Sequence, residues 1–400
     1  MEHYEKTAAS YLETLCNVKP NRRTGSQGNR QATDFFAKTI RGFGYEVDAA
    51  DFPVLDHVCR GAVLTQGDHR HEVFVSPYSL GCDVMGDIIT VTTLEELEQA
   101  DGAGKVLLLH GLICQEQLMP KNFVFYNPDH HQRIISRLES MNPLAIITAT
   151  RTNPDLVGAL DPFPLITDGD FDIPSVYCKD QTAEAIAALP DVPVHLRIDA
   201  ARLPSRAANV TAGLNMEKAG KIVLTAHIDA YEATPGALDN ASGTAVLLLA
   251  AEMLADYRGN CRLEILALNG EDHYSAAGQM DYLQRYGNDL PKVAAVINID
   301  DVGFKTGGSA YSCYGCPREL ETLAEQVFRK SPGLKRGAEW FNGDHMAFVQ
   351  NGVPAIAITA EAMEELMRTV THTGTDTPDL INCHKLVEIA RALNELVRAL

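Results

Sequence analysis

Histidine and acidic side chains follow four apolar segments in the second half of the chain. The segments end in AHID and ALNGED, in INIDD, and in AIAIT with a following THTGTD. These endings supply His227, Asp229, Glu271, Asp272, Asp300, Asp301, His372 and Asp376, and Asp239 lies twelve residues after His227. Imidazole and carboxylate groups are the side chains that bind divalent metals and that move protons in hydrolytic reactions.

If these side chains lie close together, a cation is needed among them. Carboxylates that are buried together without partners destabilise a fold by several kcal/mol each. Lysine and arginine are scarce in the four segments, so a divalent metal is the expected counter-charge. Mixed imidazole and carboxylate ligands suit zinc, with cobalt or manganese as alternatives. Each residue taken singly has a plainer interpretation, such as a helix cap for Asp239, and only the combination favours a metal centre.

Alternating strands and helices after residue 205 are expected to position these side chains. The carboxyl ends of strands in such a sheet gather at one edge, where ligands bind. We predict strands at Lys221–Ile228, Arg262–Leu268, Val293–Ile299 and Ala355–Thr359, and helices at Gly243–Tyr257, Gly278–Tyr286, Arg318–Arg329 and Lys385–Leu396. The predicted fold class is α/β, with a mixed, mainly parallel central sheet covered by helices on both faces.

The segment between residues 56 and 204 has a different pattern of apolar runs and turn residues. Short β-rich runs such as DIITVTT, KVLLLHG and LAIITAT recur between turn residues, with two short helices near Gln132–Leu138 and Gln181–Ala188. This pattern predicts a β-rich domain inserted into the chain. Residues 1–55 and 205–400 are then expected to form one domain, and residues 56–204 the insertion.

The composition excludes several classes of partner. A formal net charge of -19 disfavours nucleic acid and anionic membranes. The amino-terminal residues do not resemble a signal peptide, and no apolar stretch is long enough for a membrane span. Nine cysteines with scattered spacing indicate reduced thiols, so a cytoplasmic location is expected.

Several motifs together resemble a known enzyme family. PGALDNASG, NGED, NIDDVG and HTGTDTPDLI are similar to motifs of the di-zinc exopeptidases of clan MH. This family includes bacterial zinc aminopeptidases, glutamate carboxypeptidase, glutaminyl cyclase and the transferrin receptor ectodomain. The amino-terminal RRTGSQGNRQATDFF also resembles the entry helix of the family, and the insertion resembles, more distantly, a protease-associated domain.

The resemblance implies a set of metal ligands. His227 and Asp300 would hold one ion, Asp272 and His372 the other, and Asp239 would bridge the two. Zinc is the expected metal at both positions. The family usually has glutamate where this chain has Asp272, so the side chain here is one methylene shorter.

The resemblance also implies roles for residues that do not bind metal. Asp229 would orient the His227 imidazole, as metal-bound histidines generally require. Glu271 would act as general base for the bridging water. His345, in GDHMAF, has two equal interpretations, a histidine near the substrate or a buried, hydrogen-bonded side chain.

The expected activity is that of an exopeptidase, foremost an aminopeptidase acting on peptides. A carboxypeptidase and a glutaminyl cyclase of the same fold are alternatives. A non-catalytic, receptor-like binding protein is a further alternative, although such relatives lose metal ligands and this chain has a metal-competent side chain at every ligand position. A homodimer is a partner that the sequence leaves open.

Overall fold

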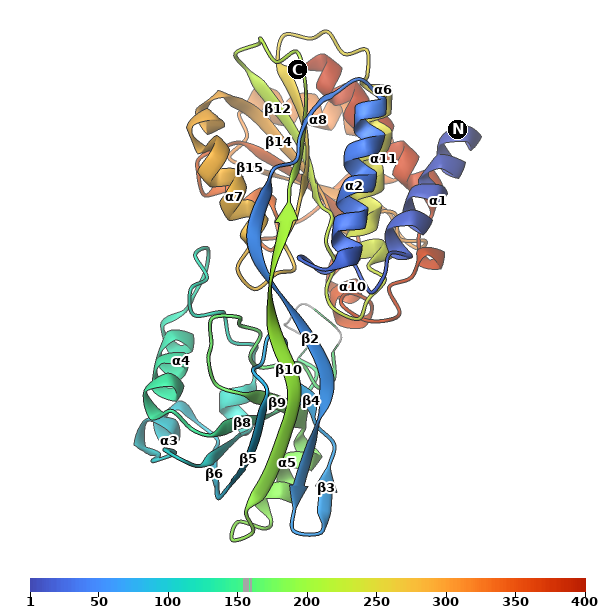
Figure 1. Ribbon diagram of the computed structural model, residues 1–400. Coiled ribbons are helices and arrows are strands. Elements are labelled where there is room, and N and C mark those ends of the chain that lie inside the picture. Colours follow the sequence, from blue (N-terminus) through green and yellow to red (C-terminus); the bar gives the residue numbers. More distant parts are fainter. Residues whose placement is uncertain (154–157, 159) are drawn as a thin grey trace. The chain divides into compact units, whose positions relative to one another are not determined.

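The computed structural model describes residues 1–153, 158 and 160–400 (Figure 1). The chain divides into two compact units. Met1–Val54 and Arg206–Leu400 form the discontinuous unit, and Leu55–Ser205 form the inserted unit. Each division lies one residue from the boundary expected from the sequence.

The discontinuous unit contains an eight-stranded sheet with the order β1-β11-β13-β12-β14-β17-β15-β16. Its strands are β1 (Glu46–Asp48), β11 (Val210–Leu214), β12 (Lys221–His227), β13 (Arg262–Leu268), β14 (Val293–Ile299), β15 (Ser309–Tyr314), β16 (Leu334–Arg336) and β17 (Ala355–Ala360). The four central strands, β13, β12, β14 and β17, are parallel, and β11 and β15 flank them in antiparallel pairs. The predicted mixed, mainly parallel sheet is therefore confirmed.

Helices cover both faces of this sheet. The helices of the unit are α1 (Glu2–Cys16), α2 (Gln27–Gly42), α6 (Gly243–Met253), α7 (Ala277–Tyr286), α8 (Arg318–Phe328), α9 (His345–Val349), α10 (Met363–Thr369) and α11 (Cys383–Ala399). On β12, Ile222 and Leu224 share one core with α1, α2, α6 and α11, which lie together in Figure 1. Lys221 Nζ instead lies 2.9 Å from the Tyr282 hydroxyl on α7, which covers the opposite face. Because successive residues of a strand point to opposite faces, every residue of β12 is buried.

The inserted unit contains two sheets. One is five-stranded, with the order β4-β9-β8-β7-β6, and the other is four-stranded, with the order β3-β2-β10-β5. The strands are β2 (Asp51–Gln66), β3 (His69–His71), β4 (Phe74–Val75), β5 (Cys82–Gly86), β6 (Ile88–Val91), β7 (Val106–Leu109), β8 (Ala145–Thr150), β9 (Ser175–Lys179) and β10 (Val194–Ala208). Helices α3 (Leu94–Gln99), α4 (Asp129–Met141) and α5 (Asp180–Ala187) accompany them, and the last two lie where the sequence predicts helices. Strands β6 to β9 are parallel, so this unit also has an α/β layer.

Short helical turns complete the chain: η1 (Gly111–Cys114), η2 (Ala237–Ser242), η3 (Gly287–Lys292) and η4 (Pro378–Leu380). Throughout the described residues, every helix is too short or too polar to cross a membrane.

Candidate metal centre

The ends of three adjacent parallel strands bring the predicted residues together. His227 is the last residue of β12 and pairs in register with Leu268, the last residue of β13. Asp272 lies four residues after β13, and Asp300 directly follows β14. Since β13, β12 and β14 are neighbours, these side chains meet at one edge of the sheet.

Asp239 lies between the two histidines. Its Oδ1 is 3.1 Å from His227 Nε2, and its Oδ2 is 3.2 Å from His372 Nε2. Each histidine has a second carboxylate beside it: Asp300 Oδ1 is 3.3 Å from His227 Nε2, and Asp272 Oδ1 is 2.9 Å from His372 Nε2. All five predicted ligands thus form two three-residue groups that share Asp239. We call these the His227 group and the His372 group.

Buried oxygen atoms in these groups lack the partners that a folded protein normally supplies. Asp300 Oδ1 and Asp272 Oδ2 are enclosed and accept no hydrogen bond. Among the ion pairs of the described residues, Asp239, Asp272 and Asp300 pair with histidine alone, never with lysine or arginine. Unsatisfied buried carboxylates are strongly unfavourable, so this donor set fits divalent metal ions.

The pKa values of these groups reflect the excess of negative charge. Burial raises the pKa of the Asp272 and Asp300 carboxyls, and the charge of Asp239 raises both further. Burial lowers the pKa of His227, but Asp300, Asp229 and Asp239 outweigh it and raise that pKa well above its ordinary value. The same negative potential that retains protons here also attracts cations.

Asp229 connects the centre to two other segments. Its Oδ1 lies 3.5 Å from His227 Nδ1. Its carboxylate also accepts a 2.8 Å hydrogen bond from Thr24 Oγ1 and bonds of 3.3 and 3.2 Å from the backbone N–H groups of Glu271 and Asp272. Asp229 therefore holds the loop after β13 in place as well as facing the imidazole.

Glu271 belongs to neither three-residue group and is half-buried. Burial raises the pKa of its carboxyl well above its usual range. The charge of His227 lowers this pKa, and the charges of Asp272 and Asp344 raise it further. A carboxyl group with a raised pKa beside a metal centre is suited to accept and return a proton.

His345 is fully buried and belongs to neither group. Its Nε2 lies 3.0 Å from the Trp340 carbonyl oxygen, and its ring packs against those of Tyr314 and Trp340. Burial lowers the pKa of His345 to about 4. Of its two interpretations, the structure favours a neutral side chain that stabilises the loop.

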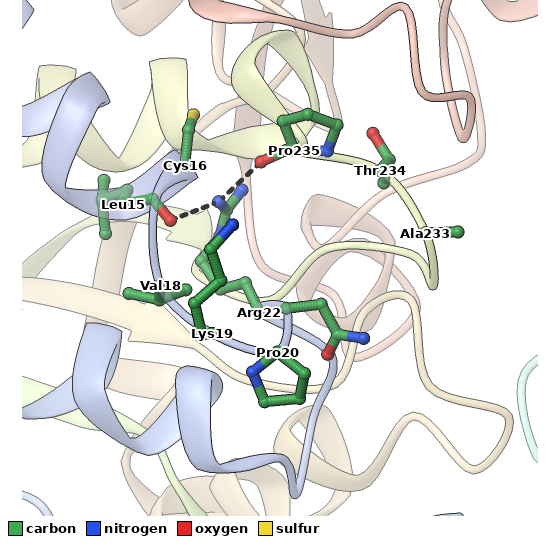
Figure 2. A pocket seen from close by; sticks show the side chains of 10 residues that line it. Leu15, Cys16, Val18, Lys19, Pro20, Arg22, Ala233, Thr234 and Pro235 are labelled. Atoms are coloured by element: carbon green, nitrogen blue, oxygen red, sulfur yellow. Dashed lines mark hydrogen bonds between the residues drawn. The ribbon is translucent and has the colours of Figure 1, made fainter. Parts of the chain in front are cut away.

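Arg22 is a positioning residue that the sequence pattern did not single out. Its guanidinium is buried and donates to the carbonyl oxygens of Leu15, Ile228, Pro235 and Gly236, at distances from 2.6 to 3.0 Å. Figure 2 shows the first and third of these contacts beside a cavity of about 220 Å³ between the turn after α1 and residues 233–235. The loop that leads from β12 to Asp239 is thus fastened at both ends by one side chain.

Asp239 is not the helix cap that its position in the sequence indicates. It lies in the turn η2 with φ -110° and ψ 91°, and α6 begins only at Gly243. Instead, Asp376 accepts bonds of 2.7 and 3.1 Å from the backbone N–H groups of Leu238 and Asp239. This contact between distant segments leaves the Asp239 carboxylate directed at the two histidines.

Two further side chains support the centre. Asn269 Oδ1 accepts a 2.7 Å bond from Asn29 Nδ2, which joins the start of the loop after β13 to α2. The Tyr231 ring stacks on the His372 imidazole with centroids 4.4 Å apart. Their roles depend on contacts across the fold; Asn269 begins the NGED motif, whereas no sequence motif marks Tyr231.

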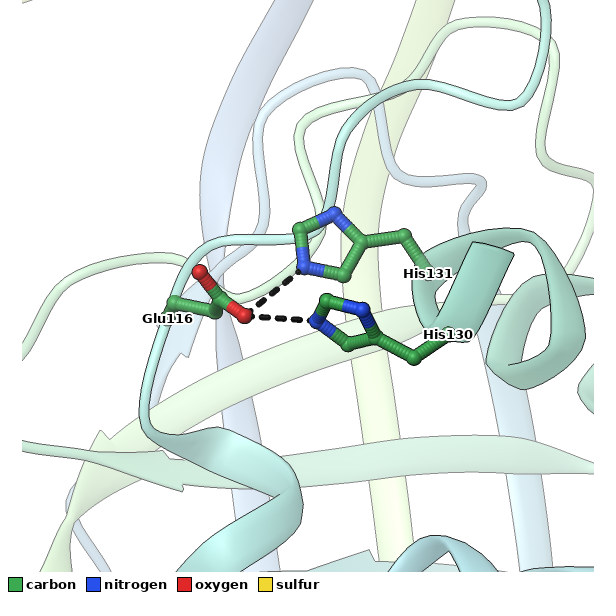
Figure 3. Close-up of side chains that lie close together, drawn as sticks. All are labelled: Glu116, His130 and His131. Atoms are coloured by element: carbon green, nitrogen blue, oxygen red, sulfur yellow. Dashed lines mark hydrogen bonds and ion pairs between the residues drawn. The ribbon is translucent and has the colours of Figure 1, made fainter. Parts of the chain in front are cut away.

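A second histidine–carboxylate group lies in the inserted unit (Figure 3). Glu116 Oε1 is 2.7 Å from His130 Nε2 and 3.2 Å from His131 Nε2. His131 Nδ1 accepts a 3.1 Å bond from the Met119 backbone N–H, so a neutral ring carries its proton on Nε2, facing Glu116. A metal at that nitrogen would have to displace this proton, which makes the group a poor metal site.

Comparison with known proteins places the centre in a family. Residues 209–397 match peptidase family M28. The match spans slightly less than half of the chain. The M28 region contains all five predicted ligands and Glu271, and the predicted family is confirmed.

Relatives of the M28 region include enzymes from bacteria and fungi. An aminopeptidase of Pseudomonas aeruginosa is 22% identical over 377 residues, covering 86% of this chain and 67% of its own length. Leucine aminopeptidase 2 of Trichophyton rubrum is 29% identical over 147 residues, 34% of this chain and 29% of that enzyme.

Solved structures share the fold over nearly the whole chain. A zinc aminopeptidase from Bacillus subtilis has a TM-score of 0.78 at 18% identity, covering 99% of this chain and 95% of that one. The aminopeptidase from Aneurinibacillus sp. strain AM-1 has a TM-score of 0.76 at 21% identity, covering 98% of this chain and 93% of that one. The Fimbriiglobus ruber glutaminyl cyclase has a TM-score of 0.53 at 13% identity, covering 99% of this chain and 95% of that one.

Proposed function

We propose that the chain is a metal-dependent aminopeptidase that removes amino-terminal residues from peptides. The observation that carries this proposal is the position of Asp239, with one carboxylate oxygen toward His227 and the other toward His372. That arrangement lies within the M28 region, and relatives of the chain are named aminopeptidases.

The two groups would hold two divalent ions, with zinc as the expected metal. His227 and Asp300 would bind the first ion, Asp272 and His372 the second, and Asp239 both. When bound, the ions lower the pKa of a bound water molecule and polarise the peptide carbonyl. Cobalt or manganese could replace zinc, because imidazole and carboxylate ligands accept all three metals.

Glu271 would transfer the proton. As general base it takes a proton from the attacking water, and as general acid it returns that proton to the departing amine. Burial already favours the protonated form of this side chain, which helps it retain the proton between the two steps. Asp229 would keep the His227 imidazole in its binding orientation.

The alternatives are weaker on specific observations. The glutaminyl cyclase fold resembles the chain less closely, with a TM-score of 0.53 against 0.78 for the zinc aminopeptidase. A glutamate-type carboxypeptidase needs arginines around its substrate carboxylates, and no arginine lies inside a metal-site motif of this chain. A receptor-like binding protein would not need Glu271 beside the two metal groups.

A peptide-library digest tests the proposed activity. Zinc-loaded protein is incubated with the library, products are identified by mass spectrometry, and the Glu271→Gln variant is run beside it. We expect products shortened from the amino terminus, formed by the wild type and not by the variant. Products shortened from the carboxyl terminus, cyclised glutaminyl termini, or no products at all would overturn the proposal.

Other expectations stay predictions. The nine cysteines are unpaired in the structure, which agrees with a reducing compartment, and a cytoplasmic location stays a prediction. The protease-associated character of the inserted unit and a homodimer are likewise untested.

A further inference from the structure

Asp301 adds a third carboxylate beside the His227 group. Its carboxylate oxygen lies within 4.8 Å of ligand atoms of both Asp239 and Asp300. Metal–oxygen distances are about 2.0–2.2 Å, so two oxygens on opposite sides of one ion are roughly 4 Å apart. Small side-chain movements would therefore allow one ion to contact all three carboxylates.

The backbone at Asp301 has an unusual conformation. Its φ is 53°, in the left-handed region that a non-glycine residue seldom adopts. Aspartate tolerates this conformation better than most residues, but it still needs support from the surrounding structure. Asp301 directly follows Asp300 at the end of β14, so adjacent residues face the same group.

Among the described residues, the charge of His227 partly offsets that of the Asp301 carboxylate but forms no ion pair with it. Its Oδ1 is enclosed and has no hydrogen-bond partner. The described residues include no lysine, arginine or histidine in an ion pair with it, and its charged neighbours include the carboxylates of Asp239, Asp300 and Asp376. The enclosed Asp300 Oδ1, on a residue that is 7% exposed, is also without a hydrogen-bond partner.

We propose that Asp301 is an additional protein ligand of the metal ion bound by the His227 group. This inference rests on the proposed metal-dependent function. The two positions then become unequal. The His227 position has three carboxylates and one imidazole, whereas the His372 position has Asp239, Asp272 and one imidazole. The His227 position binds its ion first, and it accepts manganese more readily because oxygen ligands suit this metal.

Metal titrations of variants test the assignment. Apo protein is titrated with zinc against a coloured chelator, and with cobalt while its visible absorption is recorded. The variants are Asp301→Asn, Asp301→Glu and Asp344→Asn. Asp344 is a buried acid of the same region that belongs to neither metal group, so its variant removes a charge without removing a ligand.

We expect Asp301→Asn to weaken one of two zinc sites by about 10-fold or more. The same variant should strengthen the cobalt absorption of the first equivalent, because cobalt with fewer ligands absorbs more strongly. Asp301→Glu should restore part of the affinity, and Asp344→Asn should leave affinity and spectrum unchanged. Circular dichroism verifies that each variant is folded.

Unchanged zinc affinities and an unchanged cobalt spectrum in folded Asp301→Asn would overturn the inference while leaving the proposed function intact. If that variant instead raised only the KM for peptides with a free α-amine, Asp301 would hold the substrate ammonium and not the metal. Wild-type protein that binds no metal would overturn the proposed function itself.

Discussion

The metal centre and the Glu116 group of the inserted unit contain the same kinds of side chain, yet their surroundings differ. In the metal centre, Asp300 Oδ1 and Asp272 Oδ2 are enclosed and accept no hydrogen bond. In the inserted unit, the side chains of Glu116 and His130 are 49% and 50% exposed to water, and the Met119 N–H occupies His131 Nδ1.

The difference shows that closeness of ligand-type residues does not by itself indicate a metal site. Water already solvates Glu116 and His130, and the backbone occupies His131 Nδ1, so a cation would have to displace favourable contacts. Asp300 Oδ1 and Asp272 Oδ2 accept no hydrogen bond that a cation would have to displace, and a cation relieves the repulsion between the carboxylates.

Matched glutamate substitutions should separate the two groups most strongly. Glu271→Gln removes the proton acceptor and should lower kcat by about 1,000-fold, while bound metal is retained. Glu116→Gln, the same chemical change in the inserted unit, should leave kcat within about twofold. The measurement is steady-state hydrolysis of an aminoacyl amide with metal content determined in parallel. Normal turnover in Glu271→Gln would remove the proposed general base.

Arginine substitutions test which loop supports the metal. Arg22→Met leaves four carbonyl groups, three of them in buried bonds, without their donor and should destabilise the discontinuous unit by about 4 kcal/mol, with weaker zinc binding. Arg202→Met in the inserted unit removes a donor to the Tyr78 and Phe171 carbonyls and should not change zinc binding. Urea unfolding and chelator competition measure the two effects. Equal loss of zinc affinity in both variants would contradict the positioning role of Arg22.

Two buried histidines should give different pH dependences of stability. Burial lowers the pKa of His345 to about 4, whereas an unfolded histidine takes up a proton at about 6.5. Between these values the unfolded chain binds more protons, so His345 makes stability fall as the pH falls from about 6.5 to about 4, by about 2–3 kcal/mol in total.

In His345→Gln, the stability should therefore fall less as the pH is lowered from 7 to 4.5, measured as the midpoint of urea unfolding at each pH. We call this part of the pH dependence the acid limb. His131→Gln should flatten it less, because Glu116 opposes the burial that lowers the pKa of His131. An acid limb that is identical in wild type and His345→Gln would show that this histidine does not titrate as described.

The smallest effect is expected at the exposed member of the Glu116 group. His130→Gln removes a half-exposed ion pair and should change the unfolding free energy by less than about 1 kcal/mol. Bound zinc per chain should stay the same. Loss of one zinc equivalent in this variant would show that the Glu116 group binds metal, and the proposed difference between it and the metal centre would be wrong.

Strongly patterned elements could be predicted from the sequence. Strands β13 and β14 begin and end at the predicted residues, because their apolar runs are bounded by polar residues and turns. The five ligand positions could be proposed because strand ends of a parallel sheet meet at one edge. Strand β15 was missed, since its SAYSCY sequence is short and mixes small polar with aromatic residues.

The remainder depends on contacts between distant parts of the chain. Arg22 acts on Pro235 and Gly236, more than 200 residues away, and an arginine in a polar loop gives no sign of such partners. Asp239 follows the pattern of a helix cap, but Asp376 holds its backbone in a separate turn. Such pairings arise only when the fold has formed.

The central claim is that His227, Asp239, Asp272, Asp300 and His372 hold two divalent ions. Anomalous diffraction at the zinc absorption edge, from crystals of zinc-loaded protein, tests it most directly. The account predicts two peaks, one on each side of the Asp239 carboxylate, and none beside Glu116, His130 and His131. No peak at Asp239, or a peak only in the inserted unit, would contradict it.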